Sequence, residues 1–376
     1  MTSIGPRPTV SVVVPCYKYG QYVQQTVTSI LRNERVDIDV LVIDDCSPDD
    51  SWEVVQALPR FDTRVRVVRN ERNQGLIATA NDGLDQAEGD YVVLLSADDA
   101  LAPGWLDRGV DLLERTPHAT FVKGPVRVFE GPHLPTLRKQ RDLRSVVWPG
   151  RDWIAKSCDQ GVTDVRSPEV IVRTSAQRQA GGYNPKVPYS SDMEMWLRLA
   201  SLGDVIEVTG PVSAFYRFHP SNMSRGKDLL GVGELDSNDD AFDEWYAGAG
   251  SRVEGADELL KRAHRALAVM AVARAPRAFL EDPPMFQRLC EFALEKDLLW
   301  AAPQVAKLRQ RLTSPLAVRA RDRLTPLTEA VVQTRRKVPH LRARAGAYTA
   351  WVNDRLGTAD HDATGTKARH MNGEGR

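Results

Sequence analysis

The sequence predicts an α/β fold in its first half, with helices on both faces of a sheet. Short and nearly continuous apolar runs recur along this half, and segments with apolar residues at helical spacing separate them. Strands of this composition are buried on both faces, and strands that alternate with helices form parallel sheets. Several of the runs also end in a polar or acidic sequence. Such sequences are typical of the loops at the carboxyl edge of a parallel sheet, where α/β proteins bind ligands.

The first strand is expected at residues 10–14, a Val-rich run that Pro15 stops. The second strand is expected at residues 38–43, where Asp44 and Asp45 stop another apolar run. A helix is expected between these strands, because four apolar residues recur there at helical spacing: Val23, Val27, Ile30 and Leu31.

The next elements continue this alternation. Residues 51–58 predict a short helix and residues 64–69 predict a third strand. Residues 76–87 then predict a helix, and residues 91–95 predict a fourth strand. Because parallel strands end at one edge of a sheet, the loops PCYKYG, IDDCSPDD and LSADD are expected to converge there.

Four carboxylates would then meet at this edge, those of Asp44, Asp45, Asp98 and Asp99. Crowded negative charges are unfavourable unless a cation or hydrogen-bond donors compensate them. Carboxylate oxygens suit Mg²⁺ or Mn²⁺, and no cluster of His or Cys in the sequence indicates zinc. The sequence therefore predicts a divalent cation that bridges protein acids to a ligand phosphate. The alternative is that these residues are only turn formers and helix caps.

Four motifs resemble, in the same order, those of the family-two glycosyltransferases with the GT-A fold. They are SVVVPCYKYG, VIDDCSPDDS, NQGLIATANDG and LLSADD, and the resemblance runs from about Thr9 to Ser224. It implies a Rossmann-like mixed sheet flanked by helices, a nucleotide-sugar donor and a divalent metal, Mn²⁺ or Mg²⁺. Two positions depart from the pattern. Ser96 stands where many members carry Asp, and Ala80 stands where an Arg commonly precedes the Asn.

The resemblance also implies roles for single residues. Asp45 would accept a hydrogen bond from the nucleobase, and Asp98 would lie near the ribose. Asp99 would ligate the metal. The other positions implied to bind the nucleotide or donor are Pro15, Tyr17, Asn73, Gly75 and Asn81.

Asp192 is the predicted catalytic base. It stands at the start of an amphipathic helix within residues 181–200, so one interpretation is that it and Ser191 only cap that helix. The segment also resembles the one whose Asp deprotonates the acceptor hydroxyl in the family. A helix N-terminus stabilises a carboxylate, so the two roles are compatible. One base is enough for direct displacement with inversion, whereas a retaining double displacement needs a second, nucleophilic carboxylate.

His219 is a weaker candidate site residue. Residues 214–224 alternate like an edge strand and resemble the family's Arg-x-His segment, whose His approaches the metal or the diphosphate. We therefore place His219 with the metal ligands. The alternative is that His219 is a surface or capping residue.

The sequence predicts a catalytic domain over residues 1–225, followed by a Gly- and Asp-rich linker or mobile loop over residues 226–250. Residues 251–356 predict a C-terminal helical region, and the polar residues 357–376 predict a disordered tail. The net charge of the chain is zero, but residues 303–376 carry 15 Lys or Arg and 6 Asp or Glu. This basic region is expected to contact a membrane surface or a partner protein, or to be a solvated helical surface.

The four cysteines are scattered and lack metal-ligand or redox spacing, which indicates free thiols in a reducing compartment. No signal peptide is recognisable, and no apolar stretch approaches the roughly 18 residues of a membrane-spanning helix. The expected location is the cytoplasm, including the inner face of the plasma membrane.

The predicted function is metal-dependent, inverting transfer of a hexosyl or related group from a nucleotide sugar, most simply a UDP-sugar, to an acceptor hydroxyl. The acceptor would be a glycan, a lipid-linked glycan or a small molecule, in polysaccharide, cell-envelope glycan or glycoconjugate biosynthesis, and no nucleic acid partner is expected. Two alternatives stay open. One is a catalytically silent nucleotide-sugar-binding or scaffold protein. The other is a nucleotidyltransferase, which should carry a Gly-rich basic loop after its first strand, where this chain offers only Lys18.

Overall fold

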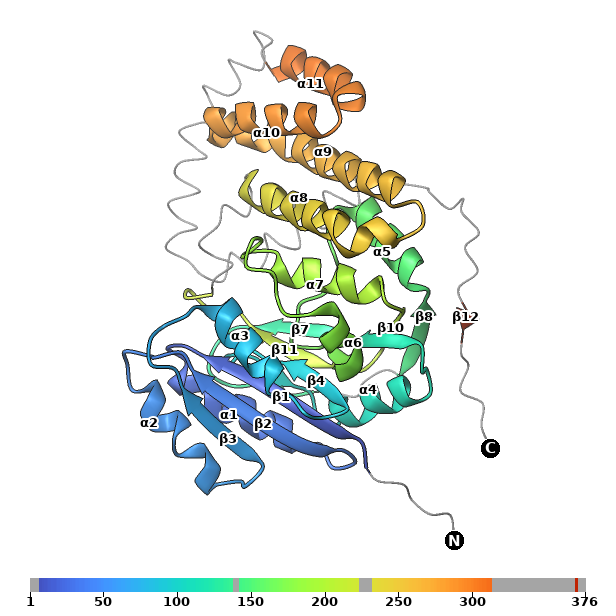
Figure 1. The fold of residues 1–376 in the computed structure, drawn as a ribbon. Helices are drawn as coiled ribbons and strands as arrows, with labels where there is room; N and C mark the ends of the chain where they lie inside the picture. The colour runs from blue at the N-terminus through green and yellow to red at the C-terminus, as the bar shows by residue number, and fades with distance from the viewer. Residues whose placement is uncertain (1–6, 138–141, 223–231, 313–368, 371–376) are drawn as a thin grey trace. The chain divides into compact units, whose positions relative to one another are not determined.

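The structure is a computed structural model, and it describes residues 7–137, 142–222, 232–312 and 369–370. Its elements are shown in Figure 1 and follow one another as β1 (Thr9–Cys16), α1 (Gly20–Leu31), β2 (Asp37–Asp44), α2 (Ser51–Val55), η1 (Leu58–Arg60), β3 (Val65–Arg69), α3 (Leu76–Asp85), β4 (Tyr91–Leu94), β5 (Ala100–Leu101), α4 (Trp105–Glu114), β6 (Ala119–Lys123), β7 (Val126–Phe129), β8 (Arg144–Trp148), α5 (Gly150–Gln160), β9 (Ile171–Arg173), α6 (Thr174–Ala180), α7 (Ser191–Ala200), β10 (Asp204–Thr209), β11 (Ala214–Arg217), α8 (Val232–Ala247), η3 (Ala249–Arg252), α9 (Ala256–Glu281), α10 (Pro283–Lys296), α11 (Leu298–Leu312) and β12 (Arg369–His370).

The larger sheet is mixed and has the strand order β12-β8-β10-β6-β9-β4-β1-β2-β3. Strands β1 to β4 pair in parallel, as predicted. Strand β9 runs antiparallel to both of its neighbours, β4 and β6, so β6 again runs in the direction of β4. Strand β10 is parallel to β6. The strands β3, β2, β1, β4, β6 and β10 therefore end at one edge of the sheet, and the predicted α/β fold with a mixed sheet is confirmed.

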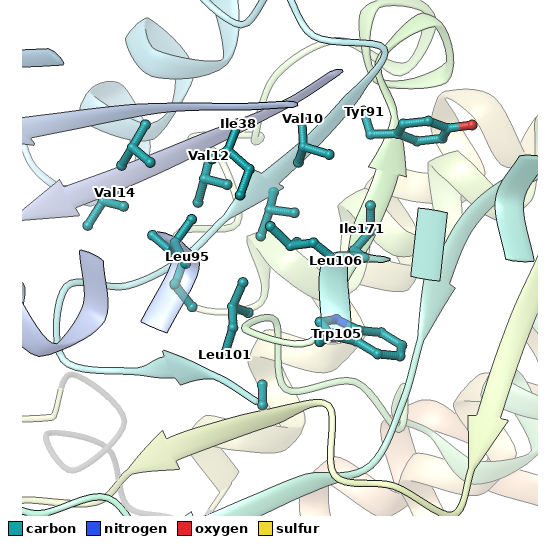
Figure 2. Close-up of a cluster of buried hydrophobic side chains, with 14 of the residues drawn as sticks. Val10, Val12, Val14, Ile38, Tyr91, Leu95, Leu101, Trp105, Leu106 and Ile171 are labelled. Carbon is teal, nitrogen blue, oxygen red and sulfur yellow. The ribbon is translucent and has the colours of Figure 1, made fainter. Parts of the chain in front are cut away.

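Both faces of β1 are buried, which explains its continuous apolar sequence. Val10, Val12 and Val14 belong to one buried cluster together with residues of α1, and Figure 2 shows their side chains beside Ile38 and Leu95. Val13 faces α3 instead, because a Cβ added at Gly83 of that helix would lie 2.2 Å from its Cγ1. Each such buried aliphatic side chain stabilises the fold by roughly 1.5–3 kcal/mol.

Helix α4 packs in the core and also holds the loop of residues 161–170. Trp105 is 1% exposed and packs in the same cluster, which Figure 2 also shows. Its indole Nε1–H donates a 2.9 Å hydrogen bond to the backbone carbonyl of Glu169. One turn further on, Gly109 lies so close to β9 that an added Cβ would be 2.4 Å from Cδ1 of Ile171. The core thus fixes the loop of residues 161–170 that precedes β9.

Strand β11 belongs to a second sheet with the order β5-β11-β7. It is the middle strand, antiparallel to β5 and parallel to β7, so the prediction of an edge strand is wrong. The alternation of polar and apolar residues predicted one solvent-facing side for this strand. Arg217, which would belong to that side, is only 1% exposed. Its guanidinium hydrogen-bonds to protein oxygens, which makes burial of its charge tolerable.

The segment predicted as a linker contains helix α8, so the prediction is wrong for residues 232–247. Leu235, Phe242 and Trp245 recur on one helical face and are fully buried, although Gly and Asp dominate the local composition. Helices α9, α10 and α11 follow, so the predicted C-terminal helical extension is confirmed. Asp282 caps α10 by accepting a hydrogen bond from the backbone N–H of Met285.

Two compact units divide the chain. The first holds Met1–Leu229, Asp236–Ala266 and Arg369–Arg376, and the second holds Leu230–Leu235 and Leu267–Ala368. The tail predicted for residues 357–376 and most of the basic region after residue 312 lie outside the described residues. Among the described residues, no helix combines the length and the apolar character needed to cross a membrane. All four cysteines are free thiols.

Candidate active site

The loops that follow β1 and β2 lie side by side, as predicted. Strand β1 lies between β2 and β4, so the loops after all three strands are neighbours at the carboxyl edge. The backbone N–H of Lys18 donates to Ser47 Oγ over 3.0 Å, and that of Gly20 donates to Ser51 Oγ over 2.9 Å. These bonds tie the PCYKYG loop to the IDDCSPDD loop and its following helix.

Asp45 anchors the loop that begins α3. Its Oδ1 accepts hydrogen bonds from Asn70 Nδ2 (2.8 Å) and from the N–H of Gln74 (2.9 Å), and its Oδ2 accepts from the N–H of Gly75 (2.8 Å). Asn73 Oδ1 accepts a second bond from the same Gly75 N–H, over 3.0 Å. Gly75 has φ of 85°, and an added Cβ would meet no atom within 4 Å. Asp45 therefore holds a glycine turn with open space beside it, which suits close approach of a ligand.

The loop after β1 offers an exposed aromatic ring. Pro15 is buried, whereas Tyr17 is 37% exposed and has Lys18 Nζ 5.0 Å from its ring centroid. Lys18 and Cys46 adopt positive φ angles of 61° and 54°, which non-glycine residues rarely do. Strain of this kind gathers at ligand sites. The role of Pro15 and Tyr17 in a base pocket stays a prediction.

Asp98 and Asp99 are both buried, each 3% exposed, and the β11 segment supplies their partners. The backbone N–H of Arg217 donates to Asp99 Oδ1 over 2.8 Å, and Arg217 Nε donates to the carbonyl of Asp98 over 2.7 Å. His219 Nε2 lies 2.8 Å from Asp98 Oδ2. The sequence grouped His219 with Asp99, whereas the structure brings His219 to Asp98, because the turn after β11 directs the ring toward the first of the two acids.

Burial and the adjacent charge of Asp98 raise the pKa of Asp99 well above its usual range. The ring of His219 packs against Tyr19 and Tyr22, at centroid distances of 5.4 and 5.6 Å. This packing fixes the imidazole that faces Asp98. The carboxyl pair is thus held rigidly, and ionising Asp99 beside Asp98 is unfavourable.

The donor atoms of this pair fit a divalent cation. Asp98 Oδ1 is buried and has no hydrogen-bond partner among the described residues. A nearby cation would lower the cost of ionising Asp99. Mg²⁺ in particular is commonly held by one or two carboxylates together with ligand phosphates, so a site of this kind needs few protein ligands. Asp98, Asp99 and His219 are the residues that would hold the cation.

A different cluster of metal-ligand type lies on α8 and α9. The ligand atoms of Asp239, Asp243 and His264 all lie within 4.8 Å of one another. His264 Nε2 is 3.1 Å from Asp243 Oδ1 and 3.4 Å from Asp239 Oδ1. These residues are on helices after the predicted catalytic segment and are separate in sequence from the acidic pair of the LSADD loop.

Asp192 lies in the first turn of α7 and is partly buried. Its Oδ1 accepts from the N–H of Met193 over 2.7 Å, and Ser167 Oγ donates to its Oδ2 over 3.1 Å. Burial raises the pKa of Asp192, although these hydrogen bonds act in the opposite direction. A carboxylate that is oriented by two donors and made more basic by burial has the properties of a general base.

Asn81 has partners within the protein. Its Nδ2 donates to the carbonyl of Tyr183 over 3.0 Å, and its Oδ1 accepts from the N–H of Tyr183 over 2.6 Å. Asn81 therefore holds the turn that precedes α7 against α3. The predicted contact of Asn81 with the donor stays a prediction, and the structure adds this positioning of the Asp192 segment.

Two site residues escaped the sequence analysis. Asn222 donates to the carbonyl of Arg217 (3.1 Å) and reaches Asp98 Oδ2 at 3.5 Å, and its Oδ1 accepts from the N–H of His219. The Pro-Ser-Asn turn signal of that segment is a clue that could have found it. Ser167, which orients Asp192, has φ of 76° and gives no comparable signal in the sequence.

Comparisons with known proteins concern the family and the fold. The family model described as glycosyl transferase family 2 matches residues 11–176. A Haemophilus influenzae protein described as an uncharacterized glycosyltransferase is 25% identical over 220 residues, which cover 58% of this chain and 68% of that relative. In three further relatives, which are 32–34% identical to this chain, the aligned segment spans about half of their length or less.

The GalNAc(5)-diNAcBac-PP-undecaprenol beta-1,3-glucosyltransferase of Campylobacter jejuni is 37% identical over 100 residues, 26% of this chain and 32% of that protein. Among solved structures, S. aureus TarS 1–349 in complex with UDP-GlcNAc superposes with a TM-score of 0.57 at 15% identity, covering 80% of this chain and 92% of that one. At this identity the likeness concerns the fold alone.

Proposed function

The chain carries a glycosyl transferase family 2 domain with the GT-A fold, and on that premise we propose that it transfers a sugar from a UDP-linked donor to an acceptor hydroxyl with inversion. The observation that carries the proposal is the buried Asp98–Asp99 pair with His219 at the sheet edge that also bears Asp45. A nucleoside diphosphate sugar needs a nucleoside pocket and charge compensation for its diphosphate, and this edge offers residues for both.

The nucleoside would lie against the loops after β1 and β2. Pro15 and Tyr17 would flank the base, and Asp45 would accept a hydrogen bond from it. Asn73 and Gly75 would line the open turn at the start of α3. Uridine is the proposed nucleoside, and the TarS structure, which resembles this chain in fold, is in complex with UDP-GlcNAc.

Asp98, Asp99 and His219 would hold Mn²⁺ or Mg²⁺. When bound, such a cation supplies the positive charge that stabilises the departing diphosphate. Asp99 needs this charge, because burial and the neighbouring charge of Asp98 raise its pKa.

Asp192 would act as the base. It takes the proton of the acceptor hydroxyl while that oxygen bonds to the anomeric carbon of the donor. The bond from this carbon to the diphosphate oxygen breaks, and its electron pair leaves with the nucleoside diphosphate. A single displacement on the face opposite the leaving group inverts the anomeric configuration, and no nucleophilic carboxylate is needed. Ser167 and the N–H of Met193 keep the carboxylate aimed.

The acceptor would be a cell-envelope glycan or a lipid-linked glycan, which the name of the Campylobacter jejuni relative supports. We also propose a cytoplasmic location and a division into a catalytic domain of residues 1–225 and a helical region of residues 251–356. Contact of the basic C-terminal region with a membrane surface or partner protein stays part of the proposal.

A panel of UDP- and GDP-sugars tests the function on the full chain with Mn²⁺ or Mg²⁺. Release of the nucleoside diphosphate and the melting temperature are measured for each donor. One donor should be hydrolysed slowly and should raise the melting temperature, and a chelator should abolish both effects. A donor at 100 times its Kd stabilises the folded state by about 2.7 kcal/mol, which such a measurement resolves. No response to any donor with either metal contradicts the proposal.

Replacing Asp192 by Asn separates an enzyme from a silent nucleotide-sugar-binding protein. An enzyme should lose about 10²–10⁴-fold in transfer rate while keeping its donor affinity, because only the proton acceptor is removed. Asp111→Asn is the matched control, since Asp111 is half-exposed on α4 and pairs with Arg115 in the next turn. If the Asp192 variant transfers as fast as the control, Asp192 is not the base.

A further inference from the structure

A cavity of about 260 Å³ lies beyond the proposed donor site along the same edge of the sheet. It opens at the carboxyl ends of β6 and β10, which run parallel to β4. The sheet order places β2, β1 and β4 on one side of β9, and β6 and β10 on the other. The cavity and the nucleotide loops therefore flank the Asp98–Asp99 pair. The lining residues that matter below are Lys123, Asp164, Arg166, Glu169, Glu207 and Thr209.

Glu169 is the most unusual residue in the lining of this cavity. Its side chain is buried, and one of its carboxylate oxygens has no hydrogen-bond partner among the described residues. The residue is 1% exposed. Its Oε1 accepts a 3.0 Å hydrogen bond from the N–H of Arg166, while Oε2 has no hydrogen-bond partner among the described residues. Burial raises the pKa of Glu169 to about 7, against the charges of Lys123 and Arg166, which lower it. A buried polar atom without a partner costs stability, and a ligand hydroxyl in the cavity would relieve that cost.

The loop that carries Glu169 also touches the proposed catalytic base. Ser167, two residues earlier, donates to Asp192. The backbone carbonyl of Glu169 is held by Trp105 from the core, so the loop has a fixed position. A group bound in the cavity would therefore lie against the loop that orients Asp192.

The charges around the cavity largely cancel. Lys123 Nζ is 3.2 Å from Asp164 Oδ2 and 3.6 Å from Glu207 Oε1, and Lys156 adds a 2.9 Å ion pair to Glu207. Such a lining favours a ligand with many hydroxyls and no net charge. The volume lies just under the roughly 300–1,000 Å³ of sites for drug-sized ligands, so it suits one sugar ring.

We propose that this cavity binds the terminal, neutral monosaccharide unit of the acceptor, with Glu169 Oε2 accepting a hydrogen bond from one of its hydroxyls. The inference rests on the proposed function, because it names the substrate class that the reaction would use. Glu169 then determines acceptor specificity. It selects a neutral hydroxyl-rich ring over a uronic acid, because Lys123 is already paired with Asp164 and Glu207, whereas the unpartnered Glu169 Oε2 would repel a ligand carboxylate.

The test uses the full chain and ligand-observed NMR with methyl glycosides of glucose, galactose, mannose, N-acetylglucosamine and glucuronic acid. Nucleotide binding and donor hydrolysis are measured separately on the same samples. The wild-type protein should bind at least one neutral glycoside and should bind the glucuronide at least tenfold more weakly. Absence of binding by all four neutral glycosides, or tighter binding of the glucuronide, overturns the inference.

Two variants locate the binding. Glu169→Gln should weaken glycoside binding at least tenfold. The substitution either replaces the unpartnered oxygen by an NH₂ group or leaves an oxygen there without the carboxylate charge. Thr209→Trp fills the cavity from an exposed position and should abolish glycoside binding even if the first variant folds poorly. Glu88→Gln, an exposed residue before the amino end of β4, is the matched control and should bind as wild type does. Wild-type glycoside affinity in Thr209→Trp overturns the inference.

These measurements also separate the inference from the proposed function. A protein that binds glycosides in the cavity but neither binds nor hydrolyses any nucleotide sugar refutes the function and retains the cavity as a saccharide site. If the protein hydrolyses a donor but binds no glycoside, the proposed function stands and the assignment of the cavity as an acceptor site is refuted.

Discussion

Replacing Arg217 by Met tests whether this buried cation holds the acidic pair in place. Arg217 Nε donates to the carbonyl of Asp98 over 2.7 Å, and its terminal nitrogens donate to the carbonyl of Gly131 and to Gln25 Oε1. Methionine has a similar length but no donor, so these oxygens lose their partner. The loss costs about 1–3 kcal/mol for each buried acceptor left unsatisfied.

The guanidinium also stacks on two rings, with its Cζ 4.3 Å from the centroid of Tyr22 and 4.5 Å from that of Phe129. Methionine keeps the apolar contact but loses a cation–π attraction of roughly 0.5–1 kcal/mol per ring. With two acceptors counted as buried, the free energy of unfolding should fall by about 3–8 kcal/mol. Urea denaturation followed by tryptophan fluorescence measures this change.

Arg66→Met is the matched control. Arg66 pairs with Asp39 at 3.0 Å, but both side chains are nearly half exposed. An exposed pair of this kind contributes about 0–1 kcal/mol, so the control should be close to wild type. If Arg217→Met lowers the free energy of unfolding by no more than the control does, the assignment of Arg217 as the support of the acidic pair is refuted.

Three further predictions follow from the same structure. Because burial raises the pKa of Glu169 from its ordinary 4.5 to about 7, its contribution to stability is complete below about pH 4.5 and is lost as the pH rises through 7. In urea titrations, Glu169→Gln should therefore raise the free energy of unfolding at pH 8, relative to that at pH 4, by about 3 kcal/mol compared with wild type. An unchanged pH dependence of the free energy of unfolding contradicts this. Gly150→Ala should lower the melting temperature, because the added Cβ would lie 1.9 Å from the carbonyl oxygen of Ala200, whereas Gly233→Ala on α8 meets no atom within 4 Å and should be neutral or stabilising; equal melting temperatures would show that the backbone yields freely at Gly150. His219→Ala should remove the extra thermal stabilisation that Mn²⁺ adds to UDP binding and leave metal-free UDP binding intact, and an undiminished Mn²⁺ effect would exclude His219 from the cation site.

Much of the sheet could be predicted from local patterns. The Val-rich run before Pro15 became β1, and the apolar run before Asp44 became β2, because both strands are buried on two faces and tolerate few polar residues. The acidic loops could be predicted for the same reason, since they begin where the apolar runs stop. Helix α8 could not, because its buried face depends on a few large side chains within a polar, Gly-containing segment.

The sequence by itself determined which loops carry the acidic and glycine motifs, since strand ends are encoded within a few neighbouring residues. Only the tertiary structure decided the partners of those motifs. It set β9 against β4 and β6, seated β11 between β5 and β7, and brought His219 to Asp98 across 121 positions of the chain. The physical reason is that strand register and the packing of the second sheet depend on contacts between distant segments, and no local periodicity specifies which of two adjacent acids a distant ring will meet.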